Sequence, residues 1–174
     1  MTKKLRPQIQ LAANLKSKDL PLTRKEIATL MAFFRREIDW ESEWVDTVQA
    51  LGAVPTTLGI YFCDDEEMRA FQKKYRKLDR TTDVLSFPAI EGQLVAPDLE
   101  DEFSLGDLIV SLPAIERGAR RGRRSPKLEL TEVLVHGVLH LLGCDHVVTG
   151  ARGRRMALRM RALQKRIFTD SRKR

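Results

Sequence analysis

Residues 128–146 read LELTEVLVHGVLHLLGCDH, and the rest of the chain is best understood around this stretch. Apolar side chains occupy nearly every side of a helix over residues 128–142, which predicts a helix buried at the centre of the domain. Gly143 follows directly and is the residue type that most often ends a helix in a left-handed turn. A buried helix needs neighbours on all sides, so the flanking sequence must supply a sheet and further helices.

The flanking sequence supplies short strand-like and helix-like segments. The predicted strands are Gln8–Ala12, Thr56–Cys63, Val84–Phe87 and Leu105–Ser111. The predicted helices are residues 24–37 after a Thr23–Glu26 capping box, Asp64 to about Arg76, Pro113–Arg121 and a C-terminal helix with Met156, Met160, Leu163 and Ile167 on one face. Residues 89–104, rich in acids, are expected to form an exposed loop. The expected fold is α+β, a single domain over residues 1–174 with a small mixed sheet packed against several helices.

Composition excludes several classes of protein. The chain has 174 residues, of which 43% are hydrophobic and 32% charged, as in one globular domain rather than a disordered or low-complexity chain. Its two cysteines, Cys63 and Cys144, are too few for a disulfide framework and fit a reducing compartment. No apolar run approaches the length of a membrane span, so we expect a cytoplasmic protein that does not contact a membrane.

Basic residues gather in two places. Residues 151–174 contain ten Lys or Arg and one acid, whereas the remaining sequence contains 21 basic and 23 acidic residues. A second basic cluster consists of Arg117, Arg120, Arg121, Arg123, Arg124 and Lys127. Such clusters suit a polyanion such as nucleic acid, although a solvated helix face has the same composition.

The only three histidines, His136, His140 and His146, lie within eleven residues. On a helix, His136 and His140 are one turn apart and share a face, so their imidazoles can hold one metal ion. A turn at Gly143 would bring His146 back as a third ligand. Three imidazoles with an open fourth position are typical of a catalytic metal site, with Zn²⁺ the leading candidate. The alternative is three histidines without a metal.

Other residues near the histidines have two interpretations each. Glu132, one turn before His136, is a candidate to orient that ligand or a helix-start acid. Asp145 is a candidate to orient His146 or to cap a turn. Cys144 is a fourth ligand or a small buried side chain. Metzincin proteases share this histidine spacing but place a glutamate base directly after the first histidine, where this chain has Gly137.

Three ordered motifs resemble the YbeY family of bacterial endoribonucleases and rRNA maturation factors. Residues 136–146, HGVLHLLGCDH, are similar to the family's H-G-x-L-H-L-x-G-Y-D-H. Residues 75–88, YRKLDRTTDVLSFP, are similar to its Y-R-x-x-D-x-P-T-D-V-L-S-F-P, and residues 105–111, LGDLIVS, to its L-G-D-I-V-I-S. Cys144 and Thr81 replace the usual tyrosine and proline, and the basic segment after His146 replaces an acid-rich one.

The resemblance implies an α+β fold, zinc on His136, His140 and His146, and cleavage of single-stranded RNA. It also implies maturation of 16S rRNA, ribosome quality control and contact with the ribosome or an assembly-factor protein. Arg76 corresponds to the family's conserved arginine and would bind the reacting phosphate, unless it forms a surface salt bridge with Asp79 or Asp83. Arg120, Arg121, Arg123 and Arg124 would follow the RNA backbone.

Two other functions share some of these features. The first is a ribosome-assembly factor whose metal is structural, with little cleavage activity of its own. The second is a metal-dependent peptidase or amidase, against which Gly137 argues because glycine has no side chain to take a proton.

Overall fold

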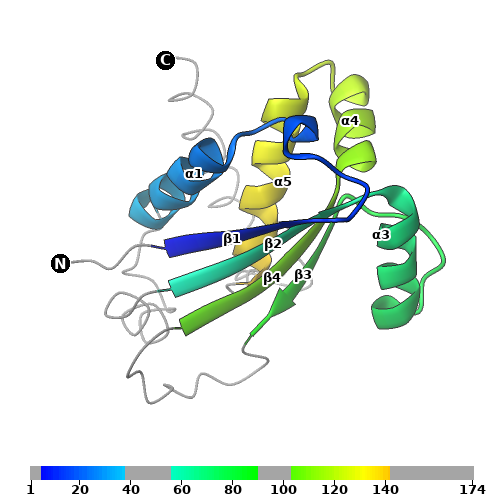
Figure 1. Ribbon diagram of the computed structural model, residues 1–174, viewed down its shortest axis with the longest axis horizontal. Helices are drawn as coiled ribbons and strands as arrows, with labels where there is room; N and C mark the ends of the chain where they lie inside the picture. Colours follow the sequence, from blue (N-terminus) through cyan, green and yellow to red (C-terminus); the bar gives the residue numbers. More distant parts are fainter. Residues whose placement is uncertain (1–4, 38–55, 90–102, 142–174) are drawn as a thin grey trace, which may run out of the picture.

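A four-stranded mixed sheet forms the centre of the computed structural model, which describes residues 5–37, 56–89 and 103–141 (Figure 1). The strands are β1 (Leu5–Leu11), β2 (Thr56–Cys63), β3 (Val84–Pro88) and β4 (Phe103–Ser111). Their order in the sheet is β1-β2-β4-β3. β1, β2 and β4 run parallel, whereas β3 is antiparallel to β4 and forms one edge of this sheet.

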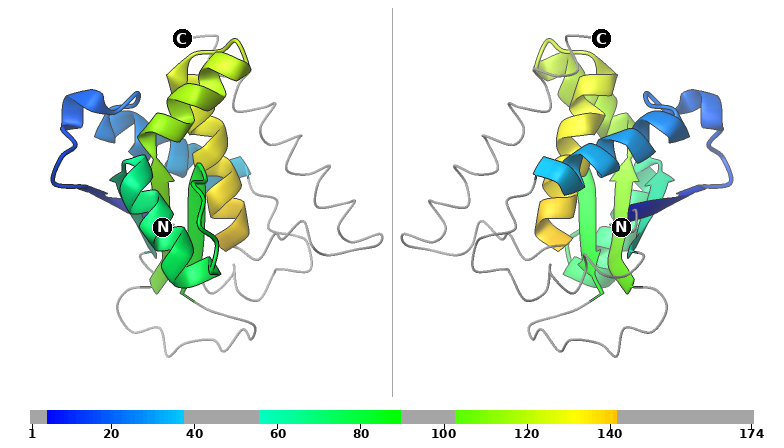
Figure 2. Two further views of the ribbon diagram at one scale, coloured as in Figure 1. Left: turned by 90° about the vertical axis from the view of Figure 1, so that its right-hand side faces the viewer. Right: turned by 90° about the vertical axis from the view of Figure 1, so that its left-hand side faces the viewer.

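Helices cover both faces of the sheet. They are the short helix η1 (Ser17–Asp19), α1 (Arg24–Glu37), α3 (Asp65–Phe71), the π-helical turn η2 (Gln72–Arg76), α4 (Leu112–Arg121) and α5 (Pro126–Leu141). Figure 2 shows α3 on one side of the sheet and α1 and α5 on the other. The α+β class with a small mixed sheet, predicted from the sequence, is therefore confirmed.

The main hydrophobic core lies between the sheet and α5. Leu108 of β4 and Leu130, Leu134 and Val138 of α5 are all completely buried in it, together with Ile27 of α1. Because α5 is covered by the sheet, α1 and α4, its sequence is apolar around nearly its whole circumference. The buried central helix predicted from residues 128–142 is thus found as α5.

A second, smaller core lies on the opposite face of the sheet. It contains Cys63, Met68, Leu85 and Ile109, and three aromatic side chains pack against it: Tyr61, Phe71 and Phe87. Along β3, Leu85 and Phe87 face this second core, and Val84 packs against the main core on the other face. The alternation of a strand explains why neighbouring residues of β3 serve two different cores.

Most predicted elements coincide with those observed. α1 and β2 have the predicted bounds. The remaining elements differ from the prediction only at their ends. β1 begins at Leu5, before the predicted start, because Leu5 pairs with Thr56 and an edge strand tolerates Pro7. Phe103 and Ser104, assigned to the loop from sequence, belong to β4 because they pair with Thr56 and Thr57.

Two predicted helices also differ slightly from the observed ones. α4 starts at Leu112, because Ser111 is its N-cap and accepts a hydrogen bond from the Ala114 N–H at 3.2 Å. The helix expected from Asp64 to Arg76 changes into a π-helical turn after Phe71 and ends at Lys77, whose φ is 60°. The predicted C-terminal helix and most of the predicted acidic loop lie outside the described residues.

The start of α1 is capped as its sequence predicts. The Thr23 N–H donates to the Glu26 carboxylate at 2.9 Å, and the Glu26 N–H donates to the Thr23 hydroxyl at 3.2 Å. Glu26 also accepts a hydrogen bond from Lys127 Nζ at 2.5 Å, which connects α1 to the first turn of α5. These hydrogen bonds, that of Lys127 first, lower the pKa of Glu26 from 4.5 to about 2.

No helix in the described parts of the chain has the length and apolar character needed to cross a bilayer.

The depressed pKa of Glu26 predicts a pH-dependent contribution to stability. The contribution is complete above about pH 4.5 and is lost as the pH falls toward about 2, because the unfolded chain binds the proton first. Glu26→Gln should therefore lower the free energy of unfolding at neutral pH by up to about 1 kcal/mol, a small value because this ion pair is exposed. Urea unfolding of both proteins from pH 7 downward measures it; a difference as large at pH 2 as at pH 7 would contradict the assignment.

Candidate functional site

His136 and His140 lie on the same side of α5, one helical turn apart. Their Nε2 atoms are 3.0 Å apart, and the two rings are perpendicular, with centroids 4.4 Å apart. Both residues are half-buried. The sequence therefore folds so that two imidazole nitrogens converge on one point beside an otherwise apolar helix, as the i and i+4 spacing predicts.

The donor set of this pair fits a zinc ion. Two nitrogens bound to one tetrahedral zinc at about 2.0–2.1 Å lie roughly 3.3–3.4 Å apart, close to the separation of the two Nε2 atoms. Within residues 5–37, 56–89 and 103–141, no group of three His, Cys, Asp or Glu side chains is placed to hold a metal. The predicted third ligand His146, like Gly143, Cys144 and Asp145, lies outside the described residues.

At Gly137, α5 packs closely against the sheet. A Cβ atom at Gly137 would lie 2.8 and 3.1 Å from the two methyl groups of Leu108 and 3.4 Å from a methyl of Val84. The Gly137 carbonyl also accepts a hydrogen bond from the Ser86 hydroxyl of β3 at 3.3 Å. The glycine between the two histidines thus holds His136 and His140 at the level of Ser86, beside the edge of the sheet.

Ser86 lies beside the histidine pair, although the sequence predicted no role for it. The strand pattern of residues 84–88, VLSFP, could have indicated which face of the sheet it occupies. Strand alternation places Ser86 on the same face as Val84, toward α5, and opposite to Leu85 and Phe87.

Arg76 lies at the end of the helix formed by α3 and η2. It is the last residue of η2, and its neighbour Tyr75 contacts Phe87 of β3 with ring centroids 5.0 Å apart. Figure 2 shows α3 and α5 on opposite sides of the sheet, with β3 between them. Because Phe87 follows Ser86, the Tyr75 ring and Gly137, between the two histidines, contact neighbouring residues of β3 from its two faces.

The acids that were alternative partners of Arg76 form contacts with other groups. Asp79 accepts a hydrogen bond from Arg69 Nε at 2.5 Å and forms an ion pair with Lys73 at 3.8 Å. Arg69 accordingly lowers the pKa of Asp79. Asp83 accepts from the Val84 N–H at 2.9 Å. Arg76 is exposed and forms no ion pair within the described residues, so its guanidinium is available to an anionic ligand.

Glu132 forms an ion pair with Arg124. Arg124 forms ion pairs with both Glu132 and Glu129 of α5, and the Glu129 side chain nests against Gly118 of α4, where a Cβ would lie 2.3 Å from its carboxylate. Glu129 is 93% buried, so its charge needs this partner. These ion pairs give Arg124 a role in joining the α4–α5 turn to α5.

Arg120, Arg121 and Arg123 are exposed at the α4–α5 turn. Arg120 forms a surface ion pair with Glu116 at 3.3 Å. The histidines follow the start of α5 by three to four turns, about 15–21 Å along the helix axis. This arginine group is therefore at the other end of α5 from His136 and His140, and the structure does not bring the two sets together.

Comparison with known proteins identifies similar sequences over most of this fold. A family model described as Endoribonuclease YbeY matches residues 16–171. An Endoribonuclease YbeY of Gloeobacter violaceus is 40% identical over 107 residues, which cover 62% of this chain and 54% of that protein. One of Aquifex aeolicus is 36% identical over 130 residues, which cover 71% of this chain and 80% of that protein.

A solved structure has the same fold. A Thermotoga maritima protein whose structure was determined in solution superposes with a TM-score of 0.53 at 21% identity, and the alignment covers 97% of this chain and 92% of that one. This likeness concerns the fold.

Gly137→Ala tests whether the close contact of α5 with the sheet constrains the site. Alanine is the better helix former, but Leu108 is completely buried and the added methyl overpacks the core. We expect a net loss of about 1 kcal/mol in the free energy of unfolding. A Leu108→Val background makes room for the added methyl, so Gly137→Ala should lower the free energy of unfolding by less there. An equal loss in both backgrounds would show that the contact with Leu108 is not its cause.

Proposed function

The chain belongs to the Endoribonuclease YbeY family, and on that premise we propose that it is a zinc-dependent endoribonuclease acting on single-stranded RNA. One observation carries the proposal: the Nε2 atoms of His136 and His140 lie 3.0 Å apart. Gly137, between these two histidines, packs directly against the sheet. The cellular substrate proposed is 16S rRNA, at its 3′-end maturation and in ribosome quality control, within the cytoplasm.

His136 and His140 would hold the zinc ion, with His146 as the third ligand. Bound zinc supplies Lewis-acid chemistry: it polarises a phosphodiester oxygen and makes water a better nucleophile. The packing around Gly137 keeps the two imidazoles in place before substrate binds, so little rearrangement is needed. Gly137 also provides no carboxylate base, which argues against the peptidase alternative.

Arg76 would bind the phosphate that reacts. A guanidinium presents a planar fork of donors to two phosphate oxygens at once, and it stabilises the additional negative charge that develops in the transition state. The ion pairs of Asp79 with Arg69 and Lys73 support this role, because Arg76 itself forms no ion pair among the residues that the structure describes.

Basic side chains far from the histidines would contact other parts of a large RNA. Arg120, Arg121 and Arg123 are exposed at the far end of α5 and suit the phosphate backbone of a ribosomal RNA. A ribosomal or assembly-factor protein is a further proposed partner.

Cleavage of an end-labelled, unstructured RNA tests the function directly. The wild type should cut the RNA, and His140→Ala, purified identically, should not and should bind less zinc. Lys18→Ala is the control, because it removes an exposed cation of η1 to which no RNA contact is assigned. Equal cutting by wild type and His140→Ala would indicate a contaminating nuclease. A wild type that contains zinc but does not cut, even on ribosomal substrate, would favour an assembly factor with a structural metal.

Arg76→Ala separates phosphate recognition from metal binding. The cleavage rate should fall on the order of 100-fold, as for other groups that stabilise transition-state charge, while the zinc content stays at the wild-type level. Arg76→Lys should recover only part of the rate, because an ammonium lacks the planar fork. Zinc analysis and single-turnover kinetics measure the two effects; loss of zinc from Arg76→Ala, or full activity, would refute the role.

A further inference from the structure

An exposed aromatic side chain lies on the sheet face opposite to the histidines. Tyr75 is 49% exposed and Leu78 is 41% exposed, and in the described parts of the chain these are the large hydrophobic side chains that solvent reaches most. Both lie at or just after the end of η2, in the segment that contains Arg76. Exposed apolar surface of this kind often marks a binding site.

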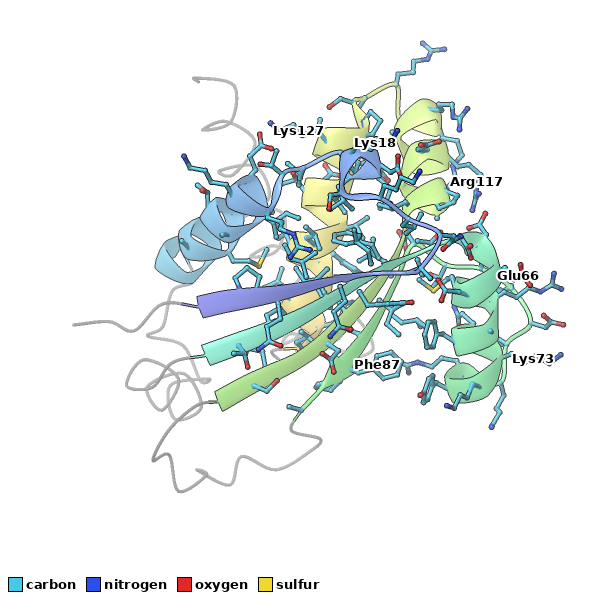
Figure 3. The ribbon with its side chains drawn as sticks, in the orientation of Figure 1. Lys18, Glu66, Lys73, Phe87, Arg117 and Lys127 are labelled. Atoms are coloured by element: carbon cyan, nitrogen blue, oxygen red, sulfur yellow. The ribbon has the colours of Figure 1, made fainter. Side chains whose placement is uncertain are left out.

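The ring of Tyr75 is held by two other aromatic rings. Phe71 lies nearly parallel to it, with centroids 6.3 Å apart and an interplanar angle of 16°, and Phe87 packs edge-on at 5.0 Å. Phe71 in turn packs edge-on against Tyr61 at 6.0 Å. Figure 3 shows Phe87 pointing from β3 toward the helix formed by α3 and η2. The exposed ring is thus supported by the second core, which reduces the entropy lost when a ligand stacks on it.

The surroundings of Tyr75 are basic. Lys74 Nζ lies 5.0 Å from the centroid of the Tyr75 ring, and Arg76, Lys77 and Arg80 are all exposed. The acid within this segment, Asp79, is neutralised by Arg69 and Lys73. An exposed ring among cations matches the two chemical groups of a nucleotide, a base that stacks and a phosphate that is negatively charged.

We propose that Tyr75 is a stacking site for one base of single-stranded RNA, and that this base adjoins the reacting phosphate bound by Arg76. This inference rests on the proposed function, since it assigns a position to the substrate of that site. Charge favours RNA over a protein partner here, because an apolar protein surface would not require a lysine beside the exposed ring and three further exposed cations in the same segment.

The position of Tyr75 defines a path for the RNA. Tyr75 contacts Phe87 on one face of β3, and Ser86 donates a hydrogen bond to Gly137 on the other, next to His136. Among the described strands, β3 lies at one edge of the sheet. An RNA strand that crosses this edge passes from the stacking site to the histidine pair, so a stacked base would set which phosphate reaches the metal site.

Binding of two matched RNAs tests the stacking site. One is an unstructured oligoribonucleotide, and the other has the same length and phosphates but abasic sugars. Fluorescence anisotropy should show that the wild type prefers the base-containing RNA roughly ten-fold. Tyr75→Leu, which remains apolar, should lose most of this preference without weaker binding of the abasic RNA, and Tyr75→Phe should keep it. Thermal unfolding checks that the variants are folded, and gels check that the RNA is intact.

Two results would overturn the proposal: a wild type that binds both RNAs equally or not at all, or a Tyr75→Leu variant that keeps the base preference. The second is the result expected if Tyr75 contacts a protein instead. Cleavage by the same preparations separates this proposal from the proposed function. If the protein does not cut RNA but prefers bases through Tyr75, the stacking site is supported and the nuclease function is refuted. If it cuts RNA without such a preference, the nuclease function is supported and the stacking site is refuted.

Discussion

The close contact of α5 with the sheet at Gly137 is the constraint on which the rest of the site depends. The side chains of Leu108 and Val84 fill the space that a Cβ would need, so α5 packs against them with no side chain of its own at this point. The backbone approaches closely enough for the Gly137 carbonyl to accept a hydrogen bond from Ser86. Because His136 precedes this contact directly, its imidazole and that of His140 are positioned by core packing, whose density resists displacement.

The edge strand β3 joins this constraint to the other face of the sheet. Successive side chains of a strand point to opposite faces, so Ser86 contacts α5 and Phe87 contacts η2. The packing that holds the histidines and the packing that holds Tyr75 and Arg76 therefore share one strand. In the proposed mode of binding, a single extended RNA strand at this edge would contact both sets of side chains.

Ion pairs explain which basic side chains remain available to a ligand. Arg124 is engaged by Glu129 and Glu132, which ties the α4–α5 turn to the buried helix. Arg69 is engaged by Asp79, whereas Arg76 has no carboxylate partner within the described residues. Charge counts from composition treat all these arginines alike, although a buried acid such as Glu129 requires its partner for stability. The geometry of the acids, more than the number of arginines, distinguishes structural cations from candidate RNA-binding ones.

The sequence by itself determined the features that depend on local periodicity and capping, namely where helices form and start and which of their residues share a face. The apolar circumference of residues 128–142 predicted α5, the Thr23–Glu26 pair predicted the start of α1, and the i and i+4 spacing predicted that His136 and His140 converge. Only the tertiary structure decided which residues from distant segments meet. The Ser86–Gly137 contact, the aromatic support of Tyr75 and the partners of Asp79 depend on how strands pair and how helices pack against them. Local sequence carries the period of a helix or strand, but packing between elements selects their neighbours.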